Sequence, residues 1–182
     1  ILIGGRLDKH NMVDNVIFSP RANLRFNPTQ NINLRLSYSS GFRAPQAFDE
    51  DMHIENVGGT VAMIERAKDL KEEKSQSFSV SADMYHRFGA FQTNLLIEGF
   101  YTRLTDVFVL GEPYDRGDGI LVKTRSNGPG AKVMGLTLEG KVAYLSILQI
   151  QAGLTLQRSR YDEPHKWHDD APAEKKIFRT PD

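Results

Sequence analysis

The stretch NINLRLSYSSGFRAP, residues 31–45, decides the fold class of this protein. Its first ten residues alternate polar and apolar side chains without a break, which is typical of a β-strand with one apolar and one polar face. The apolar positions are Ile32, Leu34, Leu36 and Tyr38. Gly41 then permits a turn, and Pro45 cannot donate a hydrogen bond to a strand ladder. We therefore expect a strand over residues 31–40 that opens into a long polar loop over residues 41–74.

The same alternation recurs along the chain and predicts further strands of about 9–14 residues. They are expected at Pro20–Asn27, Ser77–Tyr85, Thr93–Arg103, Val133–Tyr144 and Leu148–Gln157. Only Val61–Leu70 has apolar residues at helical spacing, and it predicts one or two helical turns. The chain is expected to be all-β.

Short and long connections alternate between these strands. The short turns are residues 27–30, 88–91 and 145–147, and the long polar segments are 9–19, 41–74, 111–119 and roughly 160–175. In an up-and-down antiparallel sheet, this alternation places all short turns at one end and all long loops at the other. Because long loops in a compact domain are usually functional, we expect the loop end to carry out recognition.

Two architectures fit such a sheet. A soluble or surface-exposed β-sandwich would cover its apolar face with a second sheet. A membrane β-barrel would turn that face to lipid and its polar face to a wet lumen, so a mean hydropathy of −0.43 does not exclude it. Loop asymmetry favours the barrel, and so do aromatic residues near strand ends, where an aromatic girdle would lie. These residues are Phe26, Tyr38, Tyr85, Tyr101 and Tyr144.

Composition and motifs exclude several functions. The 23 Lys and Arg residues balance 23 Asp and Glu residues, which argues against a nucleic-acid-binding protein. The chain has no cysteine, so it has no disulfide scaffold and no thiolate metal site. No run of 18 apolar residues predicts a membrane-spanning helix. Nucleotide-binding, hydrolase and zinc-protease motifs are absent from the sequence, so we expect no enzyme and no bound cofactor.

Several segments resemble the TonB-dependent outer-membrane receptors, in the order in which that family carries them. Asn33–Pro45 resembles the family's strand and "GFRAP" segment, and Asp69–Ser75 resembles "NLKPEKS". Leu95–Val107, which ends FYTRLTDV, resembles the "FYxxxxD" strand. Arg125–Gly135 resembles "RNxGxAxxxG", and Phe178–Pro181 resembles the opening of a later strand. Two positions depart from the pattern, because Glu72 replaces a usual proline and Thr137 a frequent glutamate.

The resemblance implies that residues 1–182 are a partial β-barrel domain of about eight strands. The whole barrel of this family has about 22 strands, short periplasmic turns and long extracellular loops. The plug domain and the barrel termini are expected to lie outside the chain. The implied partners are that plug, an inner-membrane energy transducer of the TonB type and the outer-membrane lipid of a Gram-negative bacterium. The implied cargo is a scarce nutrient such as an iron–siderophore, haem or cobalamin.

Candidate binding residues lie in the expected extracellular loop over residues 41–74. Arg43 can bind a carboxylate or phosphate of a ligand, clamp the plug, or instead hold loop carboxylates such as Asp49 and Asp51. His53 lies where the haem receptors of the family carry an axial histidine, although a solvated loop histidine is the simpler interpretation. His165, His168, Asp169 and Asp170 have the spacing of a surface metal site but no stable framework, so no metal is expected.

A second set of candidates lies on the polar sides of the strands and is expected to face the lumen or the plug. This set is Arg21, Arg25, Arg35, Glu98, Glu139 and Lys141. Polar residues that only solvate the barrel wall are the alternative interpretation for most of them.

Overall fold

The computed structural model describes residues 1–11, 13, 15–45, 62–117, 121–165 and 173–176. All regular structure in this part of the chain is β-strand. The strands are β1 (Leu2–Asp8), β2 (Ile17–Thr29), β3 (Ile32–Arg43), β4 (Ala62–Arg66), β5 (Glu73–Phe88), β6 (Phe91–Thr105), β7 (Phe108–Leu110), β8 (Tyr114–Asp115), β9 (Leu121–Asn127), β10 (Ala131–Tyr144), β11 (Leu148–His165) and β12 (Glu174–Lys176). Within the described residues, no helix is long and apolar enough to cross a membrane.

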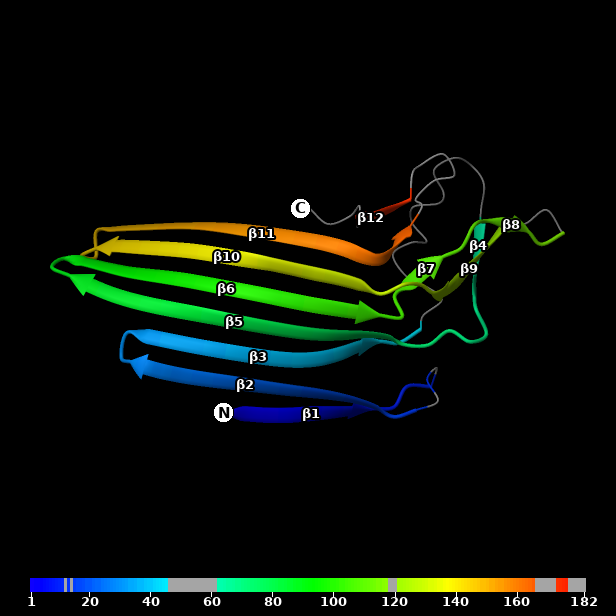
Figure 1. The fold of residues 1–182 in the computed structure, drawn as a ribbon, viewed down its shortest axis with the longest axis horizontal. Helices are drawn as coiled ribbons and strands as arrows, with labels where there is room; N and C mark the ends of the chain where they lie inside the picture. The colour runs from blue at the N-terminus through cyan, green and yellow to red at the C-terminus, as the bar shows by residue number, and fades with distance from the viewer. Residues whose placement is uncertain (12, 14, 46–61, 118–120, 166–172, 177–182) are drawn as a thin grey trace.

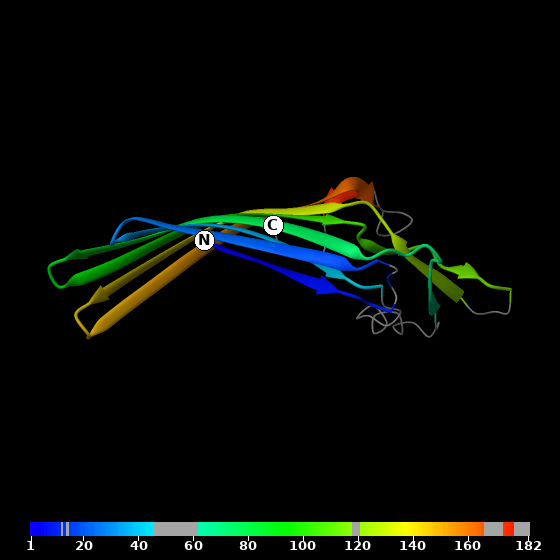
Figure 2. The same ribbon diagram turned by 90° about the horizontal axis from the view of Figure 1, so that it is seen from below.

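Eight strands form one large sheet in the order β1-β2-β3-β5-β6-β10-β11-β12 (Figure 1). Every neighbouring pair in this sheet is antiparallel. Seen from the side, the sheet is a single curved and twisted layer (Figure 2). The prediction of an all-β chain with antiparallel strands is confirmed.

The three short turns of the large sheet lie together at one end (Figure 1). They join β2 to β3, β5 to β6 and β10 to β11. Gly89 in the second turn has a φ of 60°, which glycine adopts without steric cost. Leu145 in the third turn has a φ of 48°, an uncommon conformation for a bulky side chain.

Two predictions about the segment between residues 41 and 70 are wrong. Gly41 is not a turn residue, because β3 continues to Arg43 and Gly41 pairs with Ser75 of β5. Residues 62–66 of the expected helical segment instead form β4, which pairs in parallel with Leu121–Arg125 of β9. Those ladder bonds come from residues almost 60 positions away, so local apolar spacing could not reveal them.

The strand register divides the large sheet into an apolar and a polar face. Directly paired residues point to the same side of a sheet. One apolar row consists of Leu24, Leu36, Val80, Gly99, Leu136 and Leu156. One polar row consists of Arg25, Arg35, Ser81, Glu98, Thr137 and Thr155.

The apolar face of the described sheet is open. Ile150 and Leu156 of β11 are each 60% exposed, and Val80 of β5 is 59% exposed. A β-sandwich would bury these side chains under a second sheet. No second layer covers this face in the described part of the chain, so the described strands do not form a β-sandwich.

Aromatic side chains form two clusters on the apolar face. Near the turns, the ring centroids of Phe88 and Phe91 lie 5.5 Å apart, and those of Phe91 and Tyr144 lie 4.9 Å apart. Closer to the loop end, the Tyr38 and Phe78 ring centroids lie 4.8 Å apart. Tyr85 does not belong to the expected girdle, because it points to the polar face.

The hydroxyl of Tyr85 donates a hydrogen bond to Asp83 Oδ2 at 2.8 Å. Asp83 alternates with the apolar positions of β5 and pairs with Asn33 of β3. Position near a strand end therefore did not determine which face Tyr85 occupies, whereas the register does.

A small second sheet extends from the loop end of the large one (Figure 1). Its order is β4-β9-β7, and β8 also pairs with β9. The sheet combines the segment between β3 and β5 with the segment between β6 and β10. Two segments that the sequence suggested as separate loops thus share one set of backbone hydrogen bonds.

Candidate functional site

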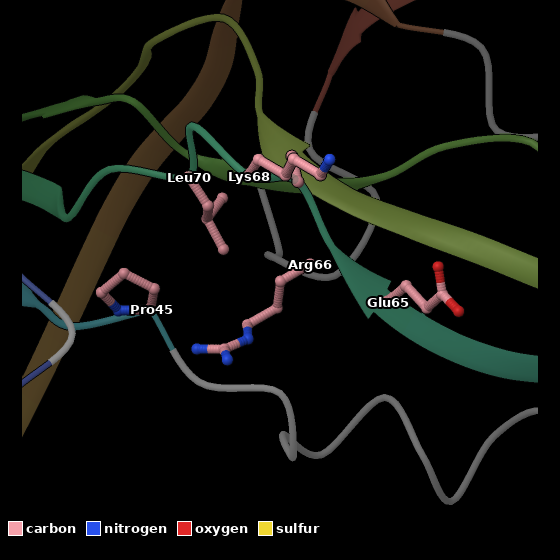
Figure 3. Close-up of a pocket in the computed structure, with 6 residues that line it drawn as sticks. Pro45, Glu65, Arg66, Lys68 and Leu70 are labelled. Carbon is pink, nitrogen blue, oxygen red and sulfur yellow. The ribbon is translucent and has the colours of Figure 1, made fainter.

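A cleft of about 430 Å³ lies beside the small sheet, between Pro45 and the chain from the end of β4 to Leu70. It is lined by Pro45, Glu65, Arg66, Ala67, Lys68 and Leu70. Arg66 and Leu70 point into the space in front of Pro45, whereas Glu65 points away from it (Figure 3). The described lining of the cleft therefore combines a guanidinium group with a leucine side chain and a proline ring.

The described residues of the cleft lining carry more positive than negative charge. Arg66 and Lys68 supply two cations, while the only carboxylate of the described lining, Glu65, lies 3.4 Å from the Arg116 guanidinium. That ion pair is exposed on both sides, so it contributes little to stability. A guanidinium beside apolar surface suits carboxylate or phosphate recognition.

Asn127, the last residue of β9, joins the two segments that build the small sheet. Its Oδ1 accepts a hydrogen bond from the Lys71 amide at 2.7 Å, and its Nδ2 donates to the Lys71 carbonyl at 3.0 Å. The same Nδ2 donates to the Asp106 carbonyl at 2.8 Å. One side chain thus holds both the chain after the cleft and the chain after β6.

Other bonds reinforce this junction. The Phe108 amide donates to Glu73 Oε2 at 3.1 Å, and the Ala67 amide donates to the Arg125 carbonyl at 2.8 Å. The Gly128 amide donates to the Val107 carbonyl at 2.7 Å. The junction thus ties the end of the cleft wall and the start of β5 to the segment that follows β6.

Arg43 ends β3 at the rim of the large sheet. Its guanidinium carbon lies 5.5 Å from the centroid of the Phe108 ring, in the geometry of a cation–π contact. Asp49, Asp51 and His53, the other expected binding residues, lie outside the described residues. His168, Asp169, Asp170 and the side chain of His165 also lie outside them.

Glu72 lies at the exit of the same segment, immediately before β5. Its Oε1 lies 3.0 Å from the Lys74 ammonium. Burial raises the pKa of Glu72, but a backbone hydrogen bond and Lys74 together outweigh burial and bring the pKa below its ordinary value. An ion pair therefore stands where the family usually has a proline.

The six residues expected to face the lumen or plug share the polar face of the large sheet. By register they are Arg21 and Arg25 on β2, Arg35 on β3, Glu98 on β6, and Glu139 and Lys141 on β10. Gln151 Nε2 donates to Glu139 Oε1 at 2.8 Å, and the Thr137 and Thr155 hydroxyls lie 3.1 Å apart. This face of the described sheet thus carries cationic, anionic and neutral polar side chains.

Sequence reasoning missed Asn127 and Arg66 as functional candidates. Asn127 lies inside the quoted Arg125–Gly135 segment, so its motif position was a usable signal. Arg66 had no such signal, because the cleft arises only when β4 pairs with β9. In the described residues, no group of three or more His, Cys, Asp or Glu side chains could hold a metal ion.

The family model for the β-barrel of TonB-dependent receptor-like proteins matches residues 1–182. The chain belongs to the TonB-dependent receptor family. Members of this family are receptors and transporters of the Gram-negative outer membrane. No curated protein sequence matches the chain.

Solved structures of TonB-dependent receptors have the same fold. The siderophore receptor PirA from Pseudomonas aeruginosa matches with a TM-score of 0.70 and 19% identity, over 88% of this chain and 31% of that protein. The iron transporter FrpB from Neisseria meningitidis (F3-3 variant) matches with a TM-score of 0.59 and 19% identity, over 81% of this chain and 20% of that protein. The chain therefore spans less than a third of the length of either protein.

Proposed function

We propose that this chain is part of the wall of an outer-membrane importer in a Gram-negative bacterium. The two-faced eight-stranded sheet carries the proposal, because its open apolar face suits lipid and its polar face suits a wet lumen. In the proposed barrel of about 22 strands, this chain supplies about eight. The short turns then lie on the periplasmic side and the small sheet on the extracellular side.

The polar face is proposed to contact the plug domain of the complete receptor. Arg21, Arg25 and Arg35 contribute cations on β2 and β3, and Glu98 and Glu139 contribute carboxylates on β6 and β10. Lys141 lies nearest the turns among these residues. Such a face can hold a plug through hydrogen bonds and water, which a transducer of the TonB type can break without exposing apolar surface to the lumen.

The loop end is proposed to bind the imported nutrient. Arg43, Asp49, Asp51 and His53 remain the proposed ligand-binding residues, and Arg66 in the cleft joins them as an anion-binding side chain. The proposed cargo is an iron–siderophore, haem or cobalamin. The structural similarity to PirA, a siderophore receptor, and FrpB, an iron transporter, supports iron among these alternatives. The proposed role is transport without covalent chemistry.

Growth on a limiting nutrient tests this proposal. A strain without the complete receptor should fail to grow when one of these nutrients is the only source of iron or cobalamin. The complete receptor should restore growth only when the inner-membrane transducer is present. Arg43→Ala should weaken uptake, while Arg6→Ala is the matched control because Arg6 also lies over a ring, that of Phe42. Equal growth with and without the receptor on every nutrient would refute the proposal.

A further inference from the structure

We propose that Asn127 is a positioning residue that makes the cleft wall and the segment after β6 move as one body. The junction of Asn127 with Lys71 and Asp106 is called the loop clip below. This inference rests on the proposed function, in which both segments belong to the extracellular, ligand-binding end. In this proposal, ligand binding in the cleft displaces the cleft wall, and Asn127 transmits the displacement to the rim of the barrel.

The loop clip uses both the carbonyl oxygen and the amino group of one amide side chain. An asparagine carries one carbonyl acceptor and two N–H donors. Here the acceptor binds the Lys71 amide, and the donors reach the carbonyls of Lys71 and Asp106. These partners are 56 and 21 residues away from Asn127, so the clip joins parts of the chain that no local structure would hold together.

The positions of Lys71 and Asp106 in the fold show which parts of the structure the loop clip connects. Lys71 directly follows Leu70, which lines the cleft. Asp106 directly follows the last residue of β6 and has a φ of 55°, so the backbone turns sharply there. A displacement of the cleft wall at Leu70 is therefore passed through Asn127 to the end of a strand of the large sheet.

Additional contacts make the two segments rigid on either side of the clip. β4 pairs with β9 over five residues, from Ala62–Leu121 to Arg66–Arg125. Glu73 accepts a hydrogen bond from Phe108, and the Phe108 ring lies beneath the Arg43 guanidinium. Lys71 lies between β4 and Glu73 in the chain. The loop clip therefore holds the stretch between the β4–β9 pairing and the hydrogen bond of Glu73 with Phe108.

Amide hydrogen exchange of the complete receptor in detergent, without ligand, tests the clip. Asn127→Ala should raise exchange roughly tenfold in both residues 67–73 and residues 106–110, because three hydrogen bonds are lost. The amides of β5 and β6 within the large sheet should keep their native rates and serve as an internal folding control. Ser126→Ala, the neighbouring substitution in β9, should leave both segments unchanged.

Two further variants test whether the hydrogen bonds of Asn127, rather than the packing of its side chain, couple residues 67–73 to residues 106–110. Asn127→Asp keeps an acceptor but places a carboxylate against two carbonyl oxygens, so its exchange should resemble that of Asn127→Ala. Ile64→Cys with Lys123→Cys places two thiols at paired positions of β4 and β9, in a chain that itself contains no cysteine. This link should restore protection of residues 67–73 in the Asn127→Ala background.

Several results would overturn the proposal. Faster exchange in only one segment, native exchange in Asn127→Ala or native exchange in Asn127→Asp would each show that the segments are not coupled through this side chain. Loss of protection in β5 and β6 as well would show a general folding role instead. The exchange measurement needs no nutrient, so it tests the loop clip independently of transport. The exchange results can contradict the clip while the growth results support transport, and the growth results can contradict transport while the exchange results support the clip.

Discussion

At the scale of single residues, the structure explains why glycine occupies two positions of the Arg125–Gly135 segment, Gly130 and Gly135. A Cβ on Gly135 would lie 2.6 Å from Phe100 Cζ and 2.7 Å from the Leu156 carbonyl oxygen. A Cβ on Gly130 would lie 2.8 Å from the Leu104 carbonyl oxygen. Both glycines therefore allow neighbouring strands to approach closely, and neither has a positive φ.

Gly135→Ala should destabilise the complete receptor, because a methyl group there collides with a ring and a backbone oxygen. We expect a loss of about 1–3 kcal/mol, as for other overpacked sites. Gly140→Ala in the same strand is the matched control, since nothing lies within 4 Å of its added Cβ. Denaturant titration of receptor folded into phospholipid vesicles measures both, and equal midpoints would contradict the packing argument.

Glu72 predicts a pH dependence at the start of β5. Its pKa lies below the ordinary value in the folded chain, so its contribution to stability is fully present above the unfolded pKa. That contribution is lost as the pH falls through the lower, folded pKa. Amide exchange at residues 73–75, corrected for the intrinsic rate, should therefore increase in acid below about pH 4. Glu72→Gln should remove this increase, and Glu112→Gln, an exposed loop substitution, should retain it.

At the scale of elements, alternation located six of the eight strands of the large sheet, all except β1 and β12, but did not set their ends. β3 runs three residues beyond Ser40 because Gly41, Phe42 and Arg43 pair with Ser75, Lys74 and Glu73. The ends depend on a neighbouring strand that the local sequence does not contain. The expected helical turns failed for the same reason, because β4 is held by β9.

The two faces of β11 give the sharpest element-scale prediction. Ile150→Arg in the complete receptor should cost about 2–4 kcal/mol if the apolar face meets lipid. Gln151→Arg, one position further on the polar face, should have a much smaller effect. Vesicle folding assays measure the pair, and equal losses of stability would refute the assignment of the faces.

At the scale of the whole molecule, the described sheet has an open apolar face and β1 and β12 at its edges. Unpaired edges and exposed apolar surface both promote association between chains. The 182-residue chain by itself should therefore associate in water and disperse in detergent. Light scattering measures this, and a well-dispersed monomer in water without detergent would contradict the membrane assignment.

Only part of the candidate site could be predicted from the sequence. The sequence analysis singled out Arg43 but placed it in a loop over residues 41–74, whereas it is the last residue of β3. The resemblance covered Asn127 within the Arg125–Gly135 segment but gave that residue no role. Neither revealed Phe108 beneath Arg43, the cleft at Arg66 or the three bonds of Asn127. Each of these depends on contacts between segments about 20 to 65 residues apart.

The sequence by itself determined the six long strands β2, β3, β5, β6, β10 and β11, their two faces and the short turns between them, because side-chain alternation and turn residues are local properties. Ordered motifs along the chain also determined the family. Only the tertiary structure decided that the long segments form a second sheet, that residues 62–66 are a strand and that Asn127 joins two segments. The physical reason is that the backbone of a strand and the side chain of Asn127 form hydrogen bonds with residues that folding brings close from distant parts of the chain. The periodicity of the sequence does not specify which residues these are.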